Sequence, residues 1–561
     1  MRLFFLIISY ISFIFCNSLT ALDYGDYLAG DSAYRNANNQ KAIIHFKKAL
    51  DLNNLDTPYG QDIAQKLCTL YLLEGEIINC ISLGKKIENK LNFDDLDSIN
   101  ILMSLVVSDI KEKKFKSALS KLKKMKKSSY ERFSVPIIQS WLIAEETKNL
   151  KKSNDKLNEL EQDLVINGLR YLNQALLYDH FDQKEEALRY YNKAVNSYEK
   201  PSYRTAKISA NAFERNGDFE KAKEIYLKFV NNSEDNLLIN NDINRIKNKK
   251  LPKKLVRNIN DAIAELFSGI ASTFNSDFTN NFSIIYSQFS LFLKEDFEVA
   301  NLYLAELMEN NKRYKYANDL YKEIKPDSNF FWHSKLRTAR NLELMGENEK
   351  SVSMLKKMVK EKEDRYDALK LLGDIYRNYN DYEKAIVFYD KAINRIEKIN
   401  VNHWDILYSR GIALERNNKW DLAEKDFLKI LELLPNQPDV LNYLSYSWIE
   451  KGINLEKAKN FIIKAVNSRP RDPYIVDSLG WAYYRLEEYD NAVKELEKAV
   501  ELKPTDPIIN DHLGDAYYKI GRKLEALYQW KKAIDFKPEK ELEKKIREKI
   551  EKFNSNKLDF I

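Results

Sequence analysis

The sequence predicts an all-α protein, a right-handed α-solenoid of about fourteen helix–turn–helix repeats that is closed by a C-terminal capping helix. First, small and large apolar residues recur with a period of about 34 residues, which is typical of such repeats. Second, 31% of the residues are charged, whereas glycine and proline number only 15 and 12, as expected of a helical chain. Third, a solenoid accommodates 561 residues without one large core, because each repeat contacts only its neighbours.

The clearest repeat lies between Arg471 and Pro504, and its characteristic residues are Leu479, Gly480, Tyr483, Ala492, Leu496 and Ala499. The next repeat has, at the same positions, Leu513, Gly514, Tyr517, Ala526, Trp530 and Ala533. Glycine within a helix costs about 0.5–1 kcal/mol relative to alanine, so its recurrence indicates that the two helices of a repeat cross closely there. We therefore expect Gly480 to lie opposite Ala492, and Gly514 opposite Ala526.

Three phrases in the C-terminal repeats are more specific than this general pattern: LNYLSYS at 441–447, DSLGWAYYR at 477–485 and NDHLGDAYY at 510–518. In these phrases the chain resembles a group of exported tetratricopeptide-repeat (TPR) proteins of Gram-negative bacteria, of proteobacterial type. The resemblance is closest over residues 404–538, and elsewhere the repeats match mainly in pattern. It implies a periplasmic or outer-membrane-associated scaffold, and it implies no catalytic residues.

Residues 1–21 have the features of a secretory signal peptide. A positive charge at Arg2 precedes the apolar run Leu3–Phe15, and the small residue Ala21 marks the expected cleavage point. This run of 13 residues is too short to span a bilayer, so we expect an exported protein without a membrane span in its mature part. Lipidation at Cys16 is an alternative, although Phe15 stands where lipoprotein processing requires a small residue.

The mature chain is predicted to consist of two solenoids. Six repeats occupy residues 22–236, and the remaining repeats occupy residues 264–540. Between them, residues 237–263 are polar and basic, and we interpret them as a linker or hinge that holds one amphipathic helix with the apolar residues Leu255, Val256, Ile259 and Ile263. Residues 541–561 are the capping helix and tail, with an apolar stripe of Leu542, Ile546, Ile550 and Phe553.

Cys68 and Cys80 occupy the two positions that are expected to face each other within the second repeat. An exported protein can form disulfides, so this pair is a candidate disulfide. Two small buried thiols are the alternative, because free cysteine is among the most buried residue types. Thiol labelling of the denatured chain, with and without prior reduction, distinguishes the two.

The first helix of each repeat is expected to line the concave side of the solenoid and to form a partner-binding groove there. The predicted groove residues are Tyr408, Asn442, Tyr446, Asp477, Trp481, Tyr484, Arg485, Asp511, Asp515 and Tyr518. Tyrosine, tryptophan and arginine dominate protein interfaces, which favours binding of a protein or a peptide segment. The acids Asp477, Asp511 and Asp515 favour a partly basic partner. For Trp481 and Tyr446, packing between repeats is the alternative role.

The sequence does not indicate an enzyme, a cofactor or a metal site. The five histidines are scattered over five repeats, and no metal-ligand spacing, P-loop or nucleophile motif occurs. His512, beside Asp511 and near Asp477, is interpreted as a surface or packing histidine. The 90 basic and 84 acidic residues give a net charge of +6, without the concentrated basic face that nucleic-acid binding requires.

The sequence thus predicts a non-catalytic protein-interaction scaffold of the bacterial cell envelope, periplasmic and with an outer-membrane complex as a candidate partner. The alternative is a chaperone-like protein that binds extended segments of exported proteins. A scaffold binds one or two folded partners at a fixed ratio, whereas a chaperone binds many segments weakly.

Overall fold

The structure is a computed structural model that describes residues 24–52, 55–90, 96–125, 131–160, 164–231, 238–273 and 280–558. Residues 24–35 are helical, and no β-strand occurs in these ranges. The helices that follow are α2 (Asn39–Leu52), α3 (Pro58–Leu73), α4 (Ile77–Ile87), α5 (Leu96–Lys111), α6 (Phe115–Lys124), α7 (Glu131–Thr147), α8 (Leu150–Asn158), α9 (Leu164–His180), α10 (Lys184–Asn196), α11 (Tyr203–Arg215), α12 (Phe219–Phe229), α13 (Asn240–Lys247), α14 (Ile259–Thr273), α15 (Asn280–Leu293), α16 (Glu298–Asn310), α17 (Tyr314–Lys322), α18 (Phe331–Leu344), α19 (Asn348–Glu361), α20 (Asp367–Asn378), α21 (Tyr382–Ile393), α22 (Trp404–Arg416), α23 (Trp420–Leu433), α24 (Pro438–Lys451), α25 (Leu455–Ser468), α26 (Pro473–Arg485), α27 (Tyr489–Leu502), α28 (Pro507–Lys519), α29 (Lys523–Asp535) and α30 (Lys540–Leu558). The predicted signal peptide lies outside the described residues, and so does Cys16.

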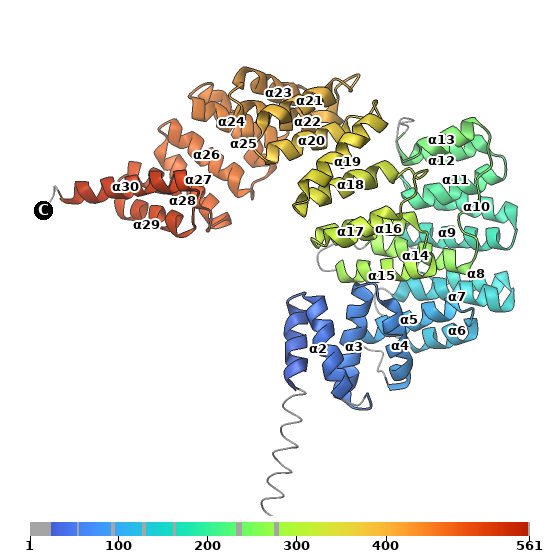
Figure 1. Cartoon of the computed structure of the whole chain (residues 1–561). Coiled ribbons are helices and arrows are strands. Elements are labelled where there is room, and N and C mark those ends of the chain that lie inside the picture. Colours follow the sequence, from blue (N-terminus) through green and yellow to red (C-terminus); the bar gives the residue numbers. More distant parts are fainter. Residues whose placement is uncertain are drawn as a thin grey trace, which may run out of the picture. The chain divides into compact units, whose positions relative to one another are not determined.

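These helices form antiparallel pairs, which can be followed in order from blue to red in Figure 1. The helical residues 24–35 pair with α2, and five further pairs run from α3 to α12. After the single helix α13, two pairs run from α14 to α17 and five pairs run from α20 to α29, with α18 and α19 between them, and α30 comes last. The predicted all-α solenoid of about fourteen repeats with a C-terminal capping helix is therefore confirmed.

The close crossing predicted at the repeat glycines is present, but the partner residue differs from the prediction. A Cβ atom added to Gly480 would lie 2.5 Å from Leu496 Cγ, and one added to Gly514 would lie 2.5 Å from Trp530 Cδ1. A large side chain therefore packs against each glycine, and it belongs to the residue four positions after the expected alanine. The reason is that a helical side chain leans toward the N-terminus of its helix and covers the preceding turn.

Short Asp–Pro sequences start the first helices of the last two repeats. Asp472 accepts hydrogen bonds from the backbone N–H groups of Tyr474 and Ile475, and Pro473 occupies the first helical position. Asp506 and Pro507 repeat this arrangement at α28. A carboxylate at the N-cap satisfies backbone donors that have no partner within the helix, and proline has no donor to lose there. These signals fix where each inner helix of the repeats begins.

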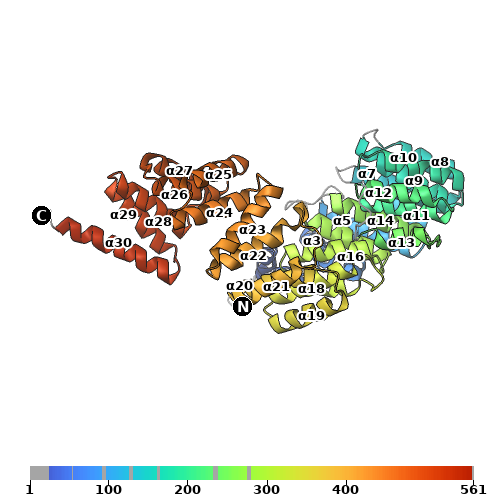
Figure 2. The ribbon, with the colours of Figure 1, turned by 90° about the horizontal axis from the view of Figure 1, so that it is seen from above.

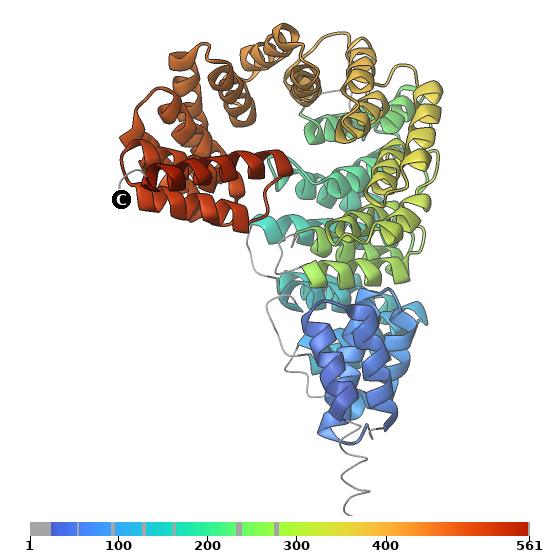
Figure 3. The same ribbon diagram turned by 60° about the vertical axis from the view of Figure 1, so that its left-hand side comes forward.

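The chain divides into two compact units, unit 1 at Met1–Gly346 and unit 2 at Glu347–Ile561. Unit 2 begins with α19 and continues as a simple succession of pairs from α20 to α29, and Figure 3 shows the yellow-to-red helices following one another along an arc. Its last helix, α30, packs its buried side chains Ile546 and Phe553 against the preceding pair. The predicted linker at residues 237–263 falls within unit 1, and the predicted domain limits stay a prediction.

Unit 1 departs from a simple solenoid, because the chain returns along its own inner face. After α13, helix α14 packs against α5 and α7, and α15 packs against α3, α4 and α5. Figure 2 shows α14 beside α5 and α11, which are first helices of earlier repeats. Lys111 of α5 donates a hydrogen bond of 2.8 Å to the backbone oxygen of Phe292 in α15. The first helices of unit 1 therefore contact a later part of the same chain.

Ion pairs fasten this returning segment. Arg204 of α11 forms a bidentate pair with the buried carboxylate of Glu265 in α14, with Nε 2.9 Å from Oε2. Arg245 of α13 donates two hydrogen bonds of 2.8 Å to the fully buried Glu214. Lys207 pairs with Asp242, which is also fully buried. Breaking a buried ion pair by removing one partner is strongly destabilising, so these pairs hold α13 and α14 in place.

The predicted single helix across 255–263 is not what the structure contains. Helix α14 begins only at Ile259, and residues 248–258 are not helical. Pro252 interrupts helical hydrogen bonding in this stretch. Lys253 and Lys254 instead form hydrogen bonds with earlier helices. The backbone oxygen of Lys253 accepts one of 2.9 Å from the Asn211 side chain, and Lys254 Nζ donates one of 2.7 Å to the backbone oxygen of Asp179. A hinge motion at 237–263 would have to break these contacts.

Candidate functional site

The predicted groove residues lie on α22, α24, α26 and α28, the first helices of four successive pairs in unit 2. Two of them, Asp477 and Asp511, are buried. Tyr518 is exposed, and the others are half-buried, namely Tyr408, Asn442, Tyr446, Trp481, Tyr484, Arg485 and Asp515. We call the exposed stripe of α22, α24, α26 and α28 the inner face of unit 2. Its accessible side chains are largely aromatic.

The carboxylates on this inner face are bound by donors from the next first helix along the chain. Glu450 of α24 accepts a hydrogen bond of 2.6 Å from Trp481 Nε1 of α26, and Arg485 Nη1 lies 3.4 Å from the same oxygen. In the same way, Glu415 of α22 accepts a hydrogen bond of 3.3 Å from the hydroxyl of Tyr443 in α24. Trp481 and Arg485 therefore contribute to packing between repeats as well as to the surface.

Asp477 is paired with His512 of α28. The ring nitrogen Nδ1 lies 3.0 Å from one carboxylate oxygen and 3.1 Å from the other. Burial alone would lower the pKa of His512, but the charge of Asp477 and its hydrogen bond outweigh burial, so the pKa is raised above its ordinary value. The His512 ring also stacks on Trp481 with centroids 4.1 Å apart, and Trp481 stacks on Tyr484 at 4.7 Å. His512 is thus a packing residue, which is one of the two roles that the sequence left open.

Asp511 and Asp515 are paired with Lys549 of the capping helix α30. Lys549 Nζ lies 2.8 Å and 2.9 Å from the two oxygens of Asp511 and 2.7 Å from Asp515. Asp515 also accepts a hydrogen bond of 3.0 Å from Trp530 Nε1. Burial and the neighbouring Asp515 raise the pKa of Asp511, and the two carboxylates together raise the pKa of Lys549 in spite of its own burial. The capping helix therefore places a cation where a basic partner was expected.

Three tyrosines of the inner face, Tyr408, Tyr446 and Tyr484, are neutral at physiological pH. Burial raises the pKa of Tyr408 and of Tyr484 to about 12. Burial likewise raises the pKa of Tyr446 above its ordinary value. Tyr408 packs among other rings, with its centroid 5.8 Å from Trp404 and 5.9 Å from Tyr443. Such side chains offer ring faces and neutral hydroxyl groups to a partner.

Sequence reasoning missed Lys549 and the roles of Glu450 and Tyr443. Asp511 and Asp515 are four residues apart on one helix face, and this spacing alone shows that one cation could serve both carboxylates. It does not show which cation, because Lys549 follows Asp511 by 38 residues in the sequence. The bond from Trp481 to Glu450 likewise joins residues 31 positions apart.

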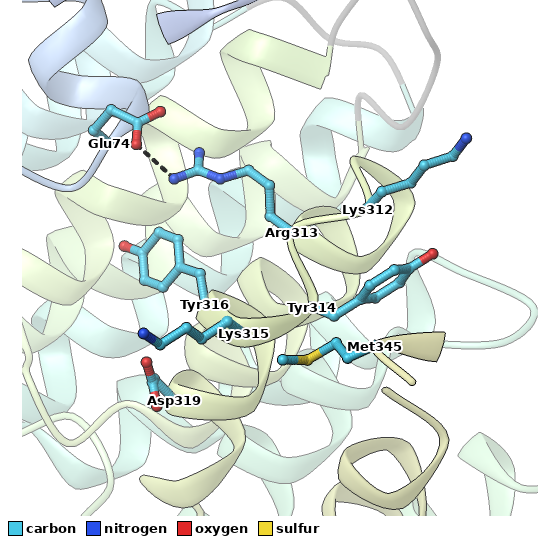
Figure 4. A pocket seen from close by; sticks show the side chains of 8 residues that line it. All are labelled: Glu74, Lys312, Arg313, Tyr314, Lys315, Tyr316, Asp319 and Met345. Carbon is cyan, nitrogen blue, oxygen red and sulfur yellow. Dashed lines mark hydrogen bonds and ion pairs between the residues drawn. The ribbon is translucent and has the colours of Figure 1, made fainter. Parts of the chain in front are cut away.

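Unit 1 carries a surface pocket of about 590 Å³ at the turn before α17 (Figure 4). Arg313 points from this turn toward Glu74 after α3, and its Nη2 lies 2.6 Å from Glu74 Oε2. Tyr314 and Met345 lie at another part of the pocket, away from this ion pair. Glu74 also accepts hydrogen bonds of 2.9 Å from Asn39 and 2.8 Å from Gln40. These polar groups hold the returning chain against the α3–α4 turn.

The structure brings Cys68 of α3 and Cys80 of α4 together, with Cα atoms 4.5 Å apart and the sulfurs joined. Both side chains are fully buried. The facing positions predicted from the repeat pattern are therefore adjacent in space. The redox state of the pair stays a prediction, which the thiol-labelling measurement tests.

Over the described ranges, no cluster of three or more His, Cys, Asp or Glu side chains has a geometry suited to a metal ion. Among the same residues, no helix combines the length and the apolar character needed to cross a membrane.

Comparisons with known proteins agree with the repeat pattern. A family profile described as TPR repeat matches residues 480–521, and one described as tetratricopeptide repeat matches residues 170–201 and 366–398. A TPR repeat-containing protein of Pseudomonas aeruginosa is 28% identical over 200 residues, which cover 36% of this chain. The chain spans about a third of the length of this relative, with 33% of it covered.

Solved structures with similarity to the chain include a TPR protein and a subunit of a larger assembly. A thermophilic TPR protein of Thermus thermophilus is 21% identical with a TM-score of 0.29, and the match covers 33% of this chain and 97% of that one. The hetero-tetramer Cut9–Hcn1 of the APC/C is 13% identical with a TM-score of 0.39, and the match covers 95% of this chain and 96% of that one. The profile matches fall on α9–α10 in unit 1 and on α20–α21 and α26–α28 in unit 2, so the chain contains tetratricopeptide repeats in both units.

Proposed function

We propose that the protein is a non-catalytic scaffold that binds a partner protein through the inner face of unit 2. TPR repeats generally serve protein–protein interaction. The contrast between the inner faces of the two units supports the choice of this binding surface. In unit 1 the first helices α3, α5 and α7 pack against α14 and α15, whereas in unit 2 the first helices present a half-exposed row of aromatic side chains. Aromatic and arginine side chains supply most of the energy in protein interfaces, which supports this location.

We also propose that the protein is located in the bacterial cell envelope. It is supported by the signal-like residues 1–21 and by the resemblance of residues 404–538 to exported TPR proteins. An outer-membrane complex is the partner assembly that this resemblance implies. Fractionation of native cells, followed by detection of the protein and of its mature N-terminus, tests this part independently. Recovery of the unprocessed chain in the cytoplasm would contradict it.

Photo-crosslinking in native cells tests the binding surface. A photo-reactive amino acid is placed at Tyr446, Tyr484 or Tyr518 on the inner face. Matched controls are Leu524 and Tyr528, which are exposed on the outer helix α29. The scaffold proposal predicts capture of one or two proteins at a fixed ratio from the inner positions and much weaker capture from α29. Capture from α29 alone would overturn it.

The alternative function, a chaperone-like binder of extended segments, is distinguished by the same experiment. One feature favours it, which is that accessible aromatic side chains recur on successive first helices, as in Tyr446, Trp481 and Tyr518. A recurring row suits an extended segment that passes several repeats. Capture of many unrelated exported proteins from all three inner positions would support this function rather than a scaffold.

A further inference from the structure

The inner face of unit 2 contains both acids and bases, and the two kinds of side chain have different surroundings. Its carboxylates are engaged within the chain: Glu450 with Trp481, Asp477 with His512, and Asp511 and Asp515 with Lys549. The last three are also shielded, since the side chains of Asp477, Asp511 and Asp515 are only 8%, 7% and 13% exposed. A basic partner would have to displace these internal cations first.

The cations of the same face are more accessible than these three acids, although Arg485 lies beside Glu450, whose side chain is 46% exposed. The side chain of Arg416 at the end of α22 is 62% exposed, and its Nε lies 3.6 Å from Glu415. The side chain of Arg485 at the end of α26 is 33% exposed, and it reaches Glu450 at 3.4 Å. Lys519 at the end of α28 is exposed, with Nζ 5.5 Å from the centre of the Tyr489 ring. Each cation occupies the same position at the C-terminal end of its first helix.

Half-exposed rings lie next to these cations. Tyr484 precedes Arg485 and stacks on Trp481, and Tyr518 precedes Lys519 and packs 5.6 Å from Trp530. A side chain with aliphatic carbons can pack on such rings, while a neighbouring carboxylate pairs with the adjacent cation. The arrangement therefore alternates sites for apolar groups with sites for negative charge.

We propose that the inner face of unit 2 binds an extended protein segment that carries carboxylates, with Arg416, Arg485 and Lys519 as the residues that pair with them. This inference rests on the proposed function and adds the chemical class of the partner. It replaces the partly basic partner that the sequence favoured, because the acids on which that expectation depended have partners within the chain.

Repeat spacing predicts the pattern of the segment. Packed neighbouring helices lie about 8–10 Å apart. A segment in the polyproline II conformation advances about 3.1 Å per residue and turns every third side chain to the same side, so one repeat corresponds to about three residues of bound segment. Arg485 and Lys519 are one repeat apart, which fits acidic residues at positions i and i+3 with apolar residues between them. Arg416 lies two repeats before Arg485 and fits a further acid at i−6.

Fluorescence anisotropy on the full chain tests the inference. The probe is a labelled extended peptide with glutamate at every third position and leucine or tyrosine between, and the matched probe has lysine in place of each glutamate. We expect the glutamate probe to bind at least about tenfold more tightly at low ionic strength, and its affinity to fall as salt is added. Equal or tighter binding of the lysine probe would overturn the inference.

Charge-reversal variants show which residues of the inner face bind the glutamate probe. Arg485→Glu and Lys519→Glu should each weaken the glutamate probe by about tenfold or more, since they replace an attraction by a repulsion. Lys494→Glu is the matched control, because it makes the same charge change at an exposed position of the outer helix α27, and it should leave the affinity unchanged. Two inner-face variants are used so that a folding defect in one, checked by circular dichroism, leaves the other informative. Equal effects of all three variants would overturn the inference.

The crosslinked peptides from Tyr484 and Tyr518 separate this inference from the proposed function. If partner proteins are captured there and the crosslinked segments are not acidic, the scaffold proposal stands and the inference on the partner class fails. If nothing is captured from the inner face and neither probe binds, both fail together. Capture of segments with acids three residues apart supports both.

Discussion

The two units use one repeat in two ways. In unit 1 the first helices α3, α5 and α7 are covered by the hairpin of α14 and α15, whereas in unit 2 the first helices α22, α24, α26 and α28 keep a half-exposed aromatic row. A TPR solenoid can therefore bury part of its inner surface against a later segment of its own chain. What distinguishes the units is therefore the later segment that returns to the inner face, and the repeat itself is the same in both.

The chemistry of the two inner faces follows this difference. The hairpin of unit 1 carries a cluster of buried rings, in which Phe267 lies 5.3 Å from Tyr286 and 5.6 Å from Phe289. Buried ion pairs such as Arg204–Glu265 fix its position. In unit 2 the pairs instead link neighbouring repeats, as in Asp477–His512, and they leave rings and cations at the surface. The contacts of unit 1 thus bury its inner side chains, whereas those of unit 2 leave inner side chains at the surface.

The largest expected effect comes from breaking the contact that closes unit 1. Arg204→Ala leaves the buried carboxylate of Glu265 without its main partner and should cost about 3–5 kcal/mol of unit 1 stability. Hydrogen exchange of the α14 amides as a function of urea measures this cost. The control is Glu224→Ala, which removes one side of an exposed pair with Lys221 and should cost less than about 1 kcal/mol. Similar losses in both variants would show that the Arg204 contact does not hold the hairpin.

A smaller effect is expected at the close crossing of the repeats in unit 2. Gly480→Ala forces a methyl group to within 2.5 Å of Leu496 and should destabilise the C-terminal repeats by about 1–3 kcal/mol. Gly269→Ala, in an open position of α14, should instead stabilise its helix by up to about 1 kcal/mol. Denaturant unfolding followed by hydrogen exchange in α26 and α14 compares the two. An equal effect of the same substitution at both sites would show that the two helices do not cross closely at Gly480.

The two units are expected to lose stability at opposite ends of the pH range. The pKa of His512 is raised above 6.5 in the folded state by Asp477, so the stabilisation is complete below pH 6.5 and is lost as the pH rises through the folded value. In unit 1 a hydrogen bond from His180 lowers the pKa of Glu145 to about 2, so that stabilisation is complete above pH 4.5 and is lost toward pH 2.

Thermal unfolding of wild type and His512→Gln on both sides of pH 6.5 measures the first effect. The wild type should lose stability of α26–α28 toward alkaline pH, and the variant should lose less over the same interval. Glu145→Gln should have no influence on that alkaline loss, which makes it the control. If the variant and the wild type show the same alkaline slope, the pair with Asp477 does not contribute in solution.

The smallest expected effect on stability is at the exposed cation Arg416. Arg416→Ala removes a side chain that is 62% exposed and should change stability by less than about 0.5 kcal/mol. It should nevertheless weaken binding of the acidic probe, because its role lies at the surface. Denaturant unfolding and anisotropy on the same preparation check both parts. A large loss of stability would mean that Arg416 serves packing between repeats.

The sequence predicted the features that depend on residues close to one another in the chain. The 34-residue period located the helix pairs, the apolar stripe Leu542–Phe553 located the capping helix, and the register brought Cys68 and Cys80 together. It could not predict the return of α14 and α15 to the inner face, because nothing in a repeat specifies where a distant hairpin packs. Lys549 was missed for the same reason, and the groove acids were therefore assigned to a basic partner.

Hydroxyl-radical footprinting of the native full chain tests the contrast between the two inner faces most directly. Trp481, Tyr484 and Tyr518 of unit 2 should be modified, and the acidic probe should protect them. Phe267, Tyr286 and Phe289 in the hairpin of unit 1 should remain unmodified with or without the probe, since all three are buried. Modification of the hairpin rings at the rate of Tyr518, or protection of no inner-face residue of unit 2, would contradict the account.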